Sequence, residues 1–153
     1  MIIRKAGLED IDLLIKLRMD FLSEDGNMTR EEQETVGGKL RIYLQKHMPD
    51  DSFIAYIAED SGDILSAAFM SIVERPPRIA IGSYLVGTVY NVFTYPGSRR
   101  KGAATKVMAA LLDEAKALDV VAVDLMASED GKYLYEKLGF DCPEKYTFMR
   151  KKL

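Results

Sequence analysis

The sequence predicts a mixed α/β fold in which a mostly antiparallel sheet is flanked by helices. Short stretches rich in β-branched and aromatic residues alternate with longer amphipathic stretches of helical period. Residues 83–126 have the pattern strand, helix, strand, which is typical of a crossover connection. The chain has 153 residues, of which 48% are hydrophobic and 29% charged. That size and composition suit one globular domain, which we place over residues 1–153.

The first half of the chain is expected to form a strand, two helices and a β-hairpin. A strand over residues 1–5 precedes apolar residues at helical spacing from Leu8 to Leu22. Thr29 and Glu32 have the spacing of a capping box, which predicts the start of the second helix. Gly37-Gly38 inside that helix indicates either a close approach of a neighbour or a tolerated surface irregularity. The hairpin strands are expected at 53–59 and 64–74, joined by Asp60-Ser61-Gly62-Asp63 and ended by Arg75-Pro76-Pro77.

The second half is expected to supply the crossover and three short elements after it. The expected elements are a strand at 83–94, a helix at 103–118, a strand at 120–126, a helix at 133–138 and a final strand at 146–151. We expect the sheet to open near residue 94, where the strand ends and the loop to the helix begins.

Composition excludes several classes of function. A net charge of −3 argues against non-specific nucleic-acid binding. No run approaches the roughly 18 apolar residues of a membrane span, and the first residues lack a signal-peptide pattern. The single cysteine, Cys142, cannot form an internal disulfide, which is consistent with a cytoplasmic location. With His47 as the only histidine, a zinc site lacks ligands and a Cys–His nucleophile pair is not expected, so no metal is predicted.

The most informative motif is Arg99-Arg100-Lys101-Gly102-Ala103-Ala104, between the strand at 83–94 and the helix that follows. The first N–H groups of a helix lack intrahelical partners, and the helix dipole favours an anion there. Gly102 and the two alanines let a phosphate approach the backbone, and the three basic side chains add positive charge. The sequence therefore predicts a phosphorylated ligand at this loop.

The spacing Arg99-x-x-Gly102-x-Ala104 resembles the signature of the GCN5-related N-acetyltransferase (GNAT) family, whose loop wraps the pyrophosphate of coenzyme A. The resemblance implies a GNAT-like acyl-CoA fold with acetyl-CoA as cosubstrate. It also implies backbone contacts to the thioester and the pantetheine arm from the end of the preceding strand. The cofactor-binding residues implied are Val92, Phe93, Thr94, Arg99, Arg100, Lys101, Gly102, Ala103, Ala104 and Thr105.

A second block, Leu134-Tyr135-Glu136-Lys137-Leu138-Gly139-Phe140, looks like the family's short helix beside the cofactor thiol. The resemblance places Tyr135 where the family has the tyrosine that protonates the departing thiolate. Packing in the core is the alternative role for this ring. Ser128 stands where many members have asparagine, and it could donate to pantetheine, cap the helix, or do both. Lys132 could pair with a phosphate or remain solvated.

The amine must lose a proton before it attacks, because a lysine-like amine is only about one part in a thousand neutral at pH 7. Several family members carry a glutamate on the central strand for this purpose, but residues 83–94 contain no acid. Glu74 is the nearest acid as a candidate base, and Asn91 could instead hold a water. Both residues could instead have no catalytic role, Glu74 as a surface carboxylate and Asn91 as a strand-edge amide.

The function expected is transfer of an acetyl group from acetyl-CoA to a primary amine by direct attack. The acceptor stays open between small molecules and peptides, and the resemblance is compatible with a homodimer. The alternative is a non-catalytic acyl-CoA-binding sensor or assembly module, because the strand glutamate is absent. Gly97-x-x-x-x-Gly102 begins like a P-loop, but Ala103 and Ala104 stand where lysine and a hydroxyl are needed, so nucleotide hydrolysis is not expected.

Overall fold

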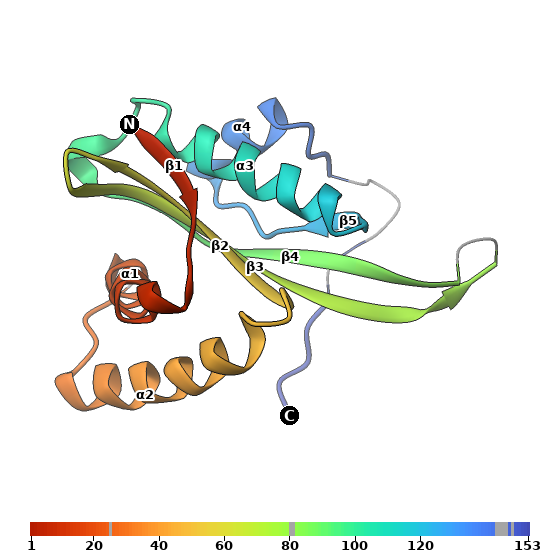
Figure 1. Ribbon diagram of the computed structural model, residues 1–153, viewed down its shortest axis with the longest axis horizontal. Coiled ribbons are helices and arrows are strands. Elements are labelled where there is room, and N and C mark those ends of the chain that lie inside the picture. The colour runs from red at the N-terminus through yellow and green to blue at the C-terminus, as the bar shows by residue number, and fades with distance from the viewer. Residues whose placement is uncertain (25, 80–81, 143–146, 148) are drawn as a thin grey trace.

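The computed structural model describes residues 1–24, 26–79, 82–142, 147 and 149–153. A five-stranded sheet of order β1-β2-β3-β4-β5 lies between two layers of helices (Figure 1). The expected mixed α/β fold is confirmed. The strands are β1 (Ile2–Lys5), β2 (Phe53–Asp60), β3 (Asp63–Arg78), β4 (Gly82–Thr94) and β5 (Val120–Asp124). The helices are α1 (Ile11–Glu24), α2 (Arg30–His47), α3 (Ala103–Ala117) and α4 (Glu129–Lys137), with 3-10 turns at Leu8–Asp10 and Pro96–Ser98. Among the described residues, no helix is long and apolar enough to cross a membrane.

Helix α2 begins as its capping box predicts. The Thr29 hydroxyl accepts from the Glu32 backbone N–H, and the Glu32 carboxylate accepts from the Thr29 N–H at 2.8 Å. Gly37 is buried, and a Cβ there would lie 3.3 Å from Cγ2 of Ile15 on α1. The close approach considered for the glycine pair therefore occurs at Gly37, whereas a Cβ at Gly38 would meet nothing within 4 Å.

The β2–β3 hairpin turns where the sequence predicts. Ser61 and Gly62 both have positive φ, 50° and 88°, as a type I′ turn requires. The expectation that Arg75-Pro76-Pro77 ends β3 is wrong, because the strand continues to Arg78. Beyond Ser71, β3 has β4 as its partner strand, and the register shifts between Arg75 and Arg78. Proline is tolerated at such an edge because no ladder hydrogen bond requires its missing N–H. The β3–β4 hairpin consequently projects as an arm beyond the sheet (Figure 1).

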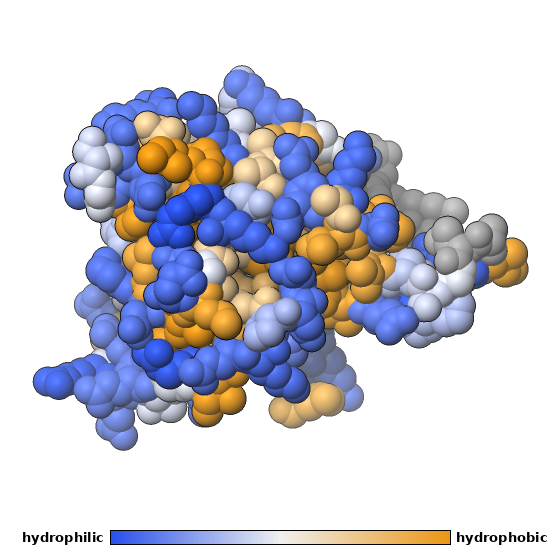
Figure 2. Space-filling view, viewed as in Figure 1, coloured by the Kyte–Doolittle hydropathy of each residue, from blue (hydrophilic) through white to orange (hydrophobic). Residues whose placement is uncertain are grey.

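Two hydrophobic cores form, one on each face of the sheet. On one face Leu14 and Leu17 of α1 and Leu44 of α2 pack on Phe53 and Phe69. The opposite face is covered by α3, whose buried residues Val107, Met108 and Leu111 pack on Ile54 and Met70. Figure 2 shows hydrophilic side chains over most of the visible face, with apolar side chains between the elements and at the outer end of the arm.

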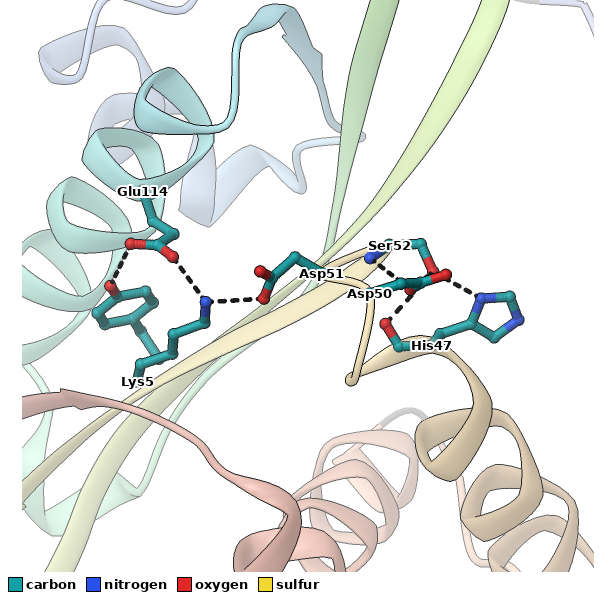
Figure 3. Close-up of polar contacts among 7 residues, drawn as sticks. Lys5, His47, Asp50, Asp51, Ser52 and Glu114 are labelled. Atoms are coloured by element: carbon teal, nitrogen blue, oxygen red, sulfur yellow. Dashed lines mark hydrogen bonds and ion pairs between the residues drawn. The ribbon is translucent and has the colours of Figure 1, made fainter.

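Polar contacts also link the cores at the edge beside β1. The Lys5 ammonium lies 2.8 Å from a carboxylate oxygen of Asp51 and 2.6 Å from one of Glu114 on α3. The Tyr56 hydroxyl donates to the second oxygen of Glu114 at 3.2 Å. These groups, shown in Figure 3, connect β1, β2, α3 and the turn after α2.

The sheet opens at the carboxyl end of β4. Strands β4 and β5 run parallel, as the expected crossover requires. On β4, only residues 85–88 pair with β5. Beyond Thr88 no residue of β4 pairs with β5, whereas Val89, Tyr90, Phe93 and Thr94 still pair with β3. A bulge at Asn91, where φ is +50°, inserts an extra residue opposite β3. The opening expected near residue 94 is present.

The last elements differ in detail from the sequence expectation. β5 ends at Asp124, and α4 begins at Glu129, one turn earlier than expected, because Ser128 caps it. Of the final strand expected at 146–151, residues 146 and 148 lie outside the described residues, and residues 147 and 149–151 have no regular secondary structure.

Candidate active site

The loop from β4 to α3 exposes backbone N–H groups at the start of a helix. Arg100 and Gly102 both adopt left-handed conformations, with φ of 60° and 78°. Gly102 is the N-cap residue of α3 and has no side chain to cap the helix. The Lys106 N–H donates to the Gly102 carbonyl at 3.1 Å, which is the first backbone hydrogen bond of the helix. The N–H groups of Ala103, Ala104 and Thr105 are therefore left for a ligand or water. This is the arrangement of an anion site.

The three basic side chains of the loop are not equivalent. Arg99 donates through Nε to the Thr94 carbonyl at 3.1 Å and also bonds to Glu24 of α1. Lys101 donates to the Gly97 carbonyl at 2.8 Å. Arg100 is exposed and makes no such bond to a described residue, so it is the arginine of the loop that can turn to a phosphate without giving up one of these contacts.

The end of β4 presents alternating faces to the opening. Val92 packs on the α3 side of the sheet, and Phe93 is buried on the α1 side. The Thr94 hydroxyl lies 2.8 Å from the Ser66 hydroxyl of β3, which also donates to the Phe93 carbonyl at 2.8 Å. The edge of these residues toward β5 pairs with no strand in the described part of the chain, which leaves it open to a ligand.

Helix α4 brings its tyrosine to the same side of the sheet. Tyr135 is half-buried beside the cluster that includes Ala103, and Val92 packs on that cluster too. Its ring meets Phe140 edge-on at 6.0 Å, and a Cβ at Gly131 would lie 3.1 Å from it. Burial raises the pKa of the Tyr135 hydroxyl. The side chain thus lies on the same core as the anion loop and the end of β4.

The other two α4 residues singled out have local roles. Ser128 caps the helix, since its hydroxyl accepts from the Gly131 N–H at 3.2 Å. Lys132 is exposed and lies 3.7 Å from Glu136 one turn further along.

The two candidates for handling the amine's proton lie in different places. Glu74 is exposed on the arm and pairs with Leu85, which is seven residues before Val92 on β4. At roughly 3.3 Å per residue, that is about 23 Å along the strand. Asn91 is buried, and its amide is bonded to α1 at both ends: Oδ1 accepts from Arg18, and Nδ2 donates to the Leu17 carbonyl.

The acidic residues near the end of α1 are mostly occupied by neighbours. Asp20 accepts from Lys16 at 2.7 Å and from the Tyr95 hydroxyl, and Glu24 is paired with Arg99. These carboxylates serve the packing of α1 on the loop before α3.

Sequence reasoning missed two side chains on the α1 side of β4 beside the opening, Arg18 and Tyr90. Arg18 follows Leu14 by four residues on α1, so it falls on the helix face that carries the core, where a charge is unusual. That position was the available signal. Tyr90 is 48% exposed on β4 just before the bulge.

A histidine, a serine and an aspartate meet in the turn after α2, without the geometry of a nucleophilic triad (Figure 3). Nδ1 of His47 lies 2.8 Å from the Ser52 hydroxyl, which donates to Asp50 at 2.6 Å. Asp50 therefore binds the serine and its backbone N–H rather than orienting the imidazole. The three residues hold the turn. Among the described residues, no group of three or more histidine, cysteine or acidic side chains is arranged to hold a metal.

Comparison with known proteins agrees with this geometry. Residues 15–140 match the family model described as the acetyltransferase (GNAT) family. A predicted acetyltransferase from Clostridium acetobutylicum, solved with acetyl-CoA, is 27% identical with a TM-score of 0.82, over 97% of this chain and 95% of that one. No curated protein matches the sequence.

Two more distant structures share the fold. A GCN5-related N-acetyltransferase from Ralstonia eutropha is 21% identical with a TM-score of 0.80, over 99% and 97% of the two chains. A glucosamine-6-phosphate N-acetyltransferase from Arabidopsis thaliana is 22% identical with a TM-score of 0.71, over 99% and 97%. With the family model spanning most of the sequence, the chain belongs to the GNAT family of acetyltransferases.

Proposed function

We propose that this protein transfers an acetyl group from acetyl-CoA to a primary amine by direct attack of the amine on the thioester. The observation that carries the proposal is the opened edge of β4 leading straight into the uncapped start of α3. An extended acyl-pantetheine chain fits an unpaired strand edge, and a pyrophosphate fits a helix N-terminus. The solved relative with acetyl-CoA supports the same cosubstrate.

The loop is proposed to bind the cosubstrate through backbone groups of residues 100–105, with Arg100 and Lys101 adding charge. Backbone groups of Val92, Phe93 and Thr94 hold the pantetheine arm and polarise the thioester carbonyl. Ser128 and Lys132 border the same ligand from the start of α4. A neutral N–H aimed at the carbonyl oxygen stabilises the charge that develops there when the amine attacks.

Tyr135 is proposed to donate its proton to the departing thiolate. A phenol has an ordinary pKa of about 10 and a thiol about 8.5, so the transfer is uphill by about 2 kcal/mol in water. Burial raises the pKa of Tyr135, and apolar surroundings also raise the pKa of a thiol. As the carbon–sulfur bond breaks, the sulfur takes the Tyr135 proton, and the tyrosine is restored by exchange with solvent.

The amine's own proton is proposed to leave to water, with neither Glu74 nor Asn91 as base. Glu74 lies on the arm, far along β4 from Val92, and the Asn91 amide is engaged by α1. The exposed side of the opening at Tyr90 gives water access to the amine.

We place the reaction in the cytoplasm, since Cys142 is exposed and the chain has no second cysteine to pair with it.

The experiment combines calorimetry of coenzyme A binding with an assay of thiol release from acetyl-CoA across a panel of primary amines. Acetyl transfer with saturation in both substrates is expected. Tight binding of coenzyme A with no thiol release above background for any amine would instead favour the non-catalytic acyl-CoA-binding module. No binding of coenzyme A would exclude both.

A further inference from the structure

Arg18 is a half-buried cation on the α1 face of the opening, and no described carboxylate pairs with it. Its Nη1 donates to the Asn91 amide oxygen at 3.2 Å, and its guanidinium lies 5.6 Å from the centre of the Phe21 ring. An amide oxygen and a ring face leave most of the five N–H donors without an acceptor among the described residues.

Other described arginines of this chain are paired with carboxylates. Arg4 binds Asp10 through both terminal nitrogens, Arg30 binds Glu34, Arg41 binds Asp12, and Arg99 binds Glu24. Arg18 is more buried than Arg4. Burial lowers the pKa of Arg18, and the nearby Tyr90 acts in the opposite direction. Placing an arginine there without a carboxylate costs solvation that the chain itself does not recover.

Arg18 lies near a solvent-exposed aromatic side chain on β4. Tyr90 on β4 is 48% exposed and lies close enough to act electrostatically on both Arg18 and Tyr43 of α2. The Asn91 that holds Arg18 immediately precedes Val92, whose backbone is proposed to face the thioester. The nearest acids of α1 are bound elsewhere, Asp20 by Lys16 and Glu24 by Arg99, so they do not neutralise Arg18.

We propose that Arg18 binds an oxyanion, a carboxylate or a phosphate monoester, carried by the amine acceptor. This inference rests on the proposed acetyl transfer and names the class of amine that it uses. The guanidinium fork matches both oxyanions in geometry and charge. Asn91, in the bulge of β4, acts as a positioning residue because its amide oxygen accepts a hydrogen bond from the Arg18 guanidinium and fixes its orientation. The acceptor is thereby oriented with its anion at α1 and its amine at the end of β4.

The first test measures binding, so that it does not depend on turnover. Glycine, β-alanine, γ-aminobutyrate, ε-aminocaproate and phosphoethanolamine are titrated into the coenzyme A-loaded protein, beside the alkylamines of equal length and ethanolamine. At least one anionic amine is expected to bind about 10-fold or more tighter than its neutral counterpart, and that preference to vanish in Arg18→Met. Comparison of the carboxylate-bearing amines with phosphoethanolamine shows which oxyanion is bound. Equal binding of every matched pair by the parent protein overturns the proposal.

The second test separates recognition from scaffolding. Arg18→Met is expected to raise KM for the anionic acceptor about 10- to 100-fold, with kcat and the KM for acetyl-CoA nearly unchanged. Arg18→Lys should recover part of the loss, because a point charge remains. Lys39→Met, which removes an exposed cation from α2, is the matched control and should change nothing.

Melting temperature distinguishes the two roles of Arg18. The Met variant should melt close to the parent, because removing a half-buried charge without a carboxylate offsets the loss of the hydrogen bond to Asn91. A lower melting temperature, with anionic and neutral amines weakened alike, would show a structural role and overturn the proposal. Coenzyme A binding without thiol release, accompanied by an intact anion preference in the first test, would refute acetyl transfer while leaving the anion site standing.

Discussion

Arg18 of α1 and Asn91 of β4, 73 residues apart in the sequence, are joined by a hydrogen bond of 3.2 Å at the bulge where the sheet opens. Asn91 has a left-handed backbone there, with φ of +50°, and its Nδ2 donates to the Leu17 carbonyl at 3.4 Å. Asparagine is among the side chains that tolerate this conformation best. The bulge therefore depends on one side chain for both its backbone geometry and its attachment to α1.

Replacing Asn91 should separate these two contributions. Asn91→Ala loses the buried amide bonds and places a Cβ in the left-handed region, so the free energy of unfolding should fall by about 2–3 kcal/mol. Asn91→Gly loses the same bonds without the strain and should be about 1 kcal/mol more stable than the alanine variant. Urea unfolding measures both. Asn27→Ala, at an exposed position, should stay within about 0.5 kcal/mol of the parent. Equal stability of the Ala and Gly variants would contradict the strained bulge.

Removing the Tyr135 hydroxyl should reduce turnover while leaving the fold intact. Tyr135→Phe keeps the ring that packs on Phe140, and general acid catalysis contributes about 10²–10⁴-fold, so kcat should fall by that factor. Coenzyme A affinity and melting temperature should stay nearly constant. An acyl donor with a more acidic thiol should recover much of the rate, because its thiolate needs no proton.

The matched control for this variant is Tyr133→Phe, on the same helix but 65% exposed. It should turn over like the parent. If Tyr135→Phe also turns over like the parent, another group or water supplies the proton, and if it only loses stability, the ring has a packing role.

A side chain at Gly102 should abolish coenzyme A binding. A Cβ there would meet no atom within 4 Å, but φ is +78°, so valine costs about 1–2 kcal/mol and tends to shift the loop. The displaced N–H groups would no longer converge on a pyrophosphate, and calorimetry should show a large loss of affinity.

Gly62→Val is the matched control, because Gly62 has φ of +88°, is equally open and lies in the β2–β3 turn. It should lower the melting temperature by a similar amount without affecting coenzyme A. Unchanged coenzyme A affinity in Gly102→Val would place the pyrophosphate elsewhere.

The Arg4–Asp10 pair predicts a dependence of stability on acid pH. Both terminal nitrogens of Arg4 bind the Asp10 carboxylate, at 2.7 and 2.8 Å, and the Gly7 N–H adds a third bond at 2.9 Å. Hydrogen bonds from Arg4, more than those from Gly7, lower the pKa of Asp10 against the opposing effect of burial. The unfolded chain therefore binds this proton more readily than the folded one, and the stabilisation is present above the ordinary aspartate pKa and lost as pH falls through the folded value.

Asp10→Asn should accordingly cost about 1–3 kcal/mol at neutral pH, and its difference from the parent should shrink below about pH 4. Urea unfolding across pH measures this. Arg4→Met should flatten the same part of the profile, since the main cause of the lowered pKa is then absent. A difference between Asp10→Asn and the parent that grows toward acid pH would contradict the assignment.

The sequence by itself determined the elements whose signals are local. The capping box at Thr29, the hairpin turn at Asp60-Ser61-Gly62-Asp63 and the crossover through 103–118 follow from neighbouring residues, because caps, turns and hydrophobic period act within a few positions. The loop around Gly102 could be predicted as an anion site for the same reason, because its glycine, its basic residues and the following helix are contiguous in the sequence. The match to the family model covers residues 15–140, a range that contains this loop and the block around Tyr135.

Only the tertiary structure decided what depends on pairing between distant segments. Pro76 and Pro77 stay in β3 because β2 has already ended and leaves that edge without a partner, which no local signal reveals. Glu74 lies on the arm because the register of β3 against β4 puts it opposite Leu85. The meeting of Arg18 with Asn91 arises because α1 packs across the bulge of β4, bringing together side chains whose separation in the chain gives no hint of contact.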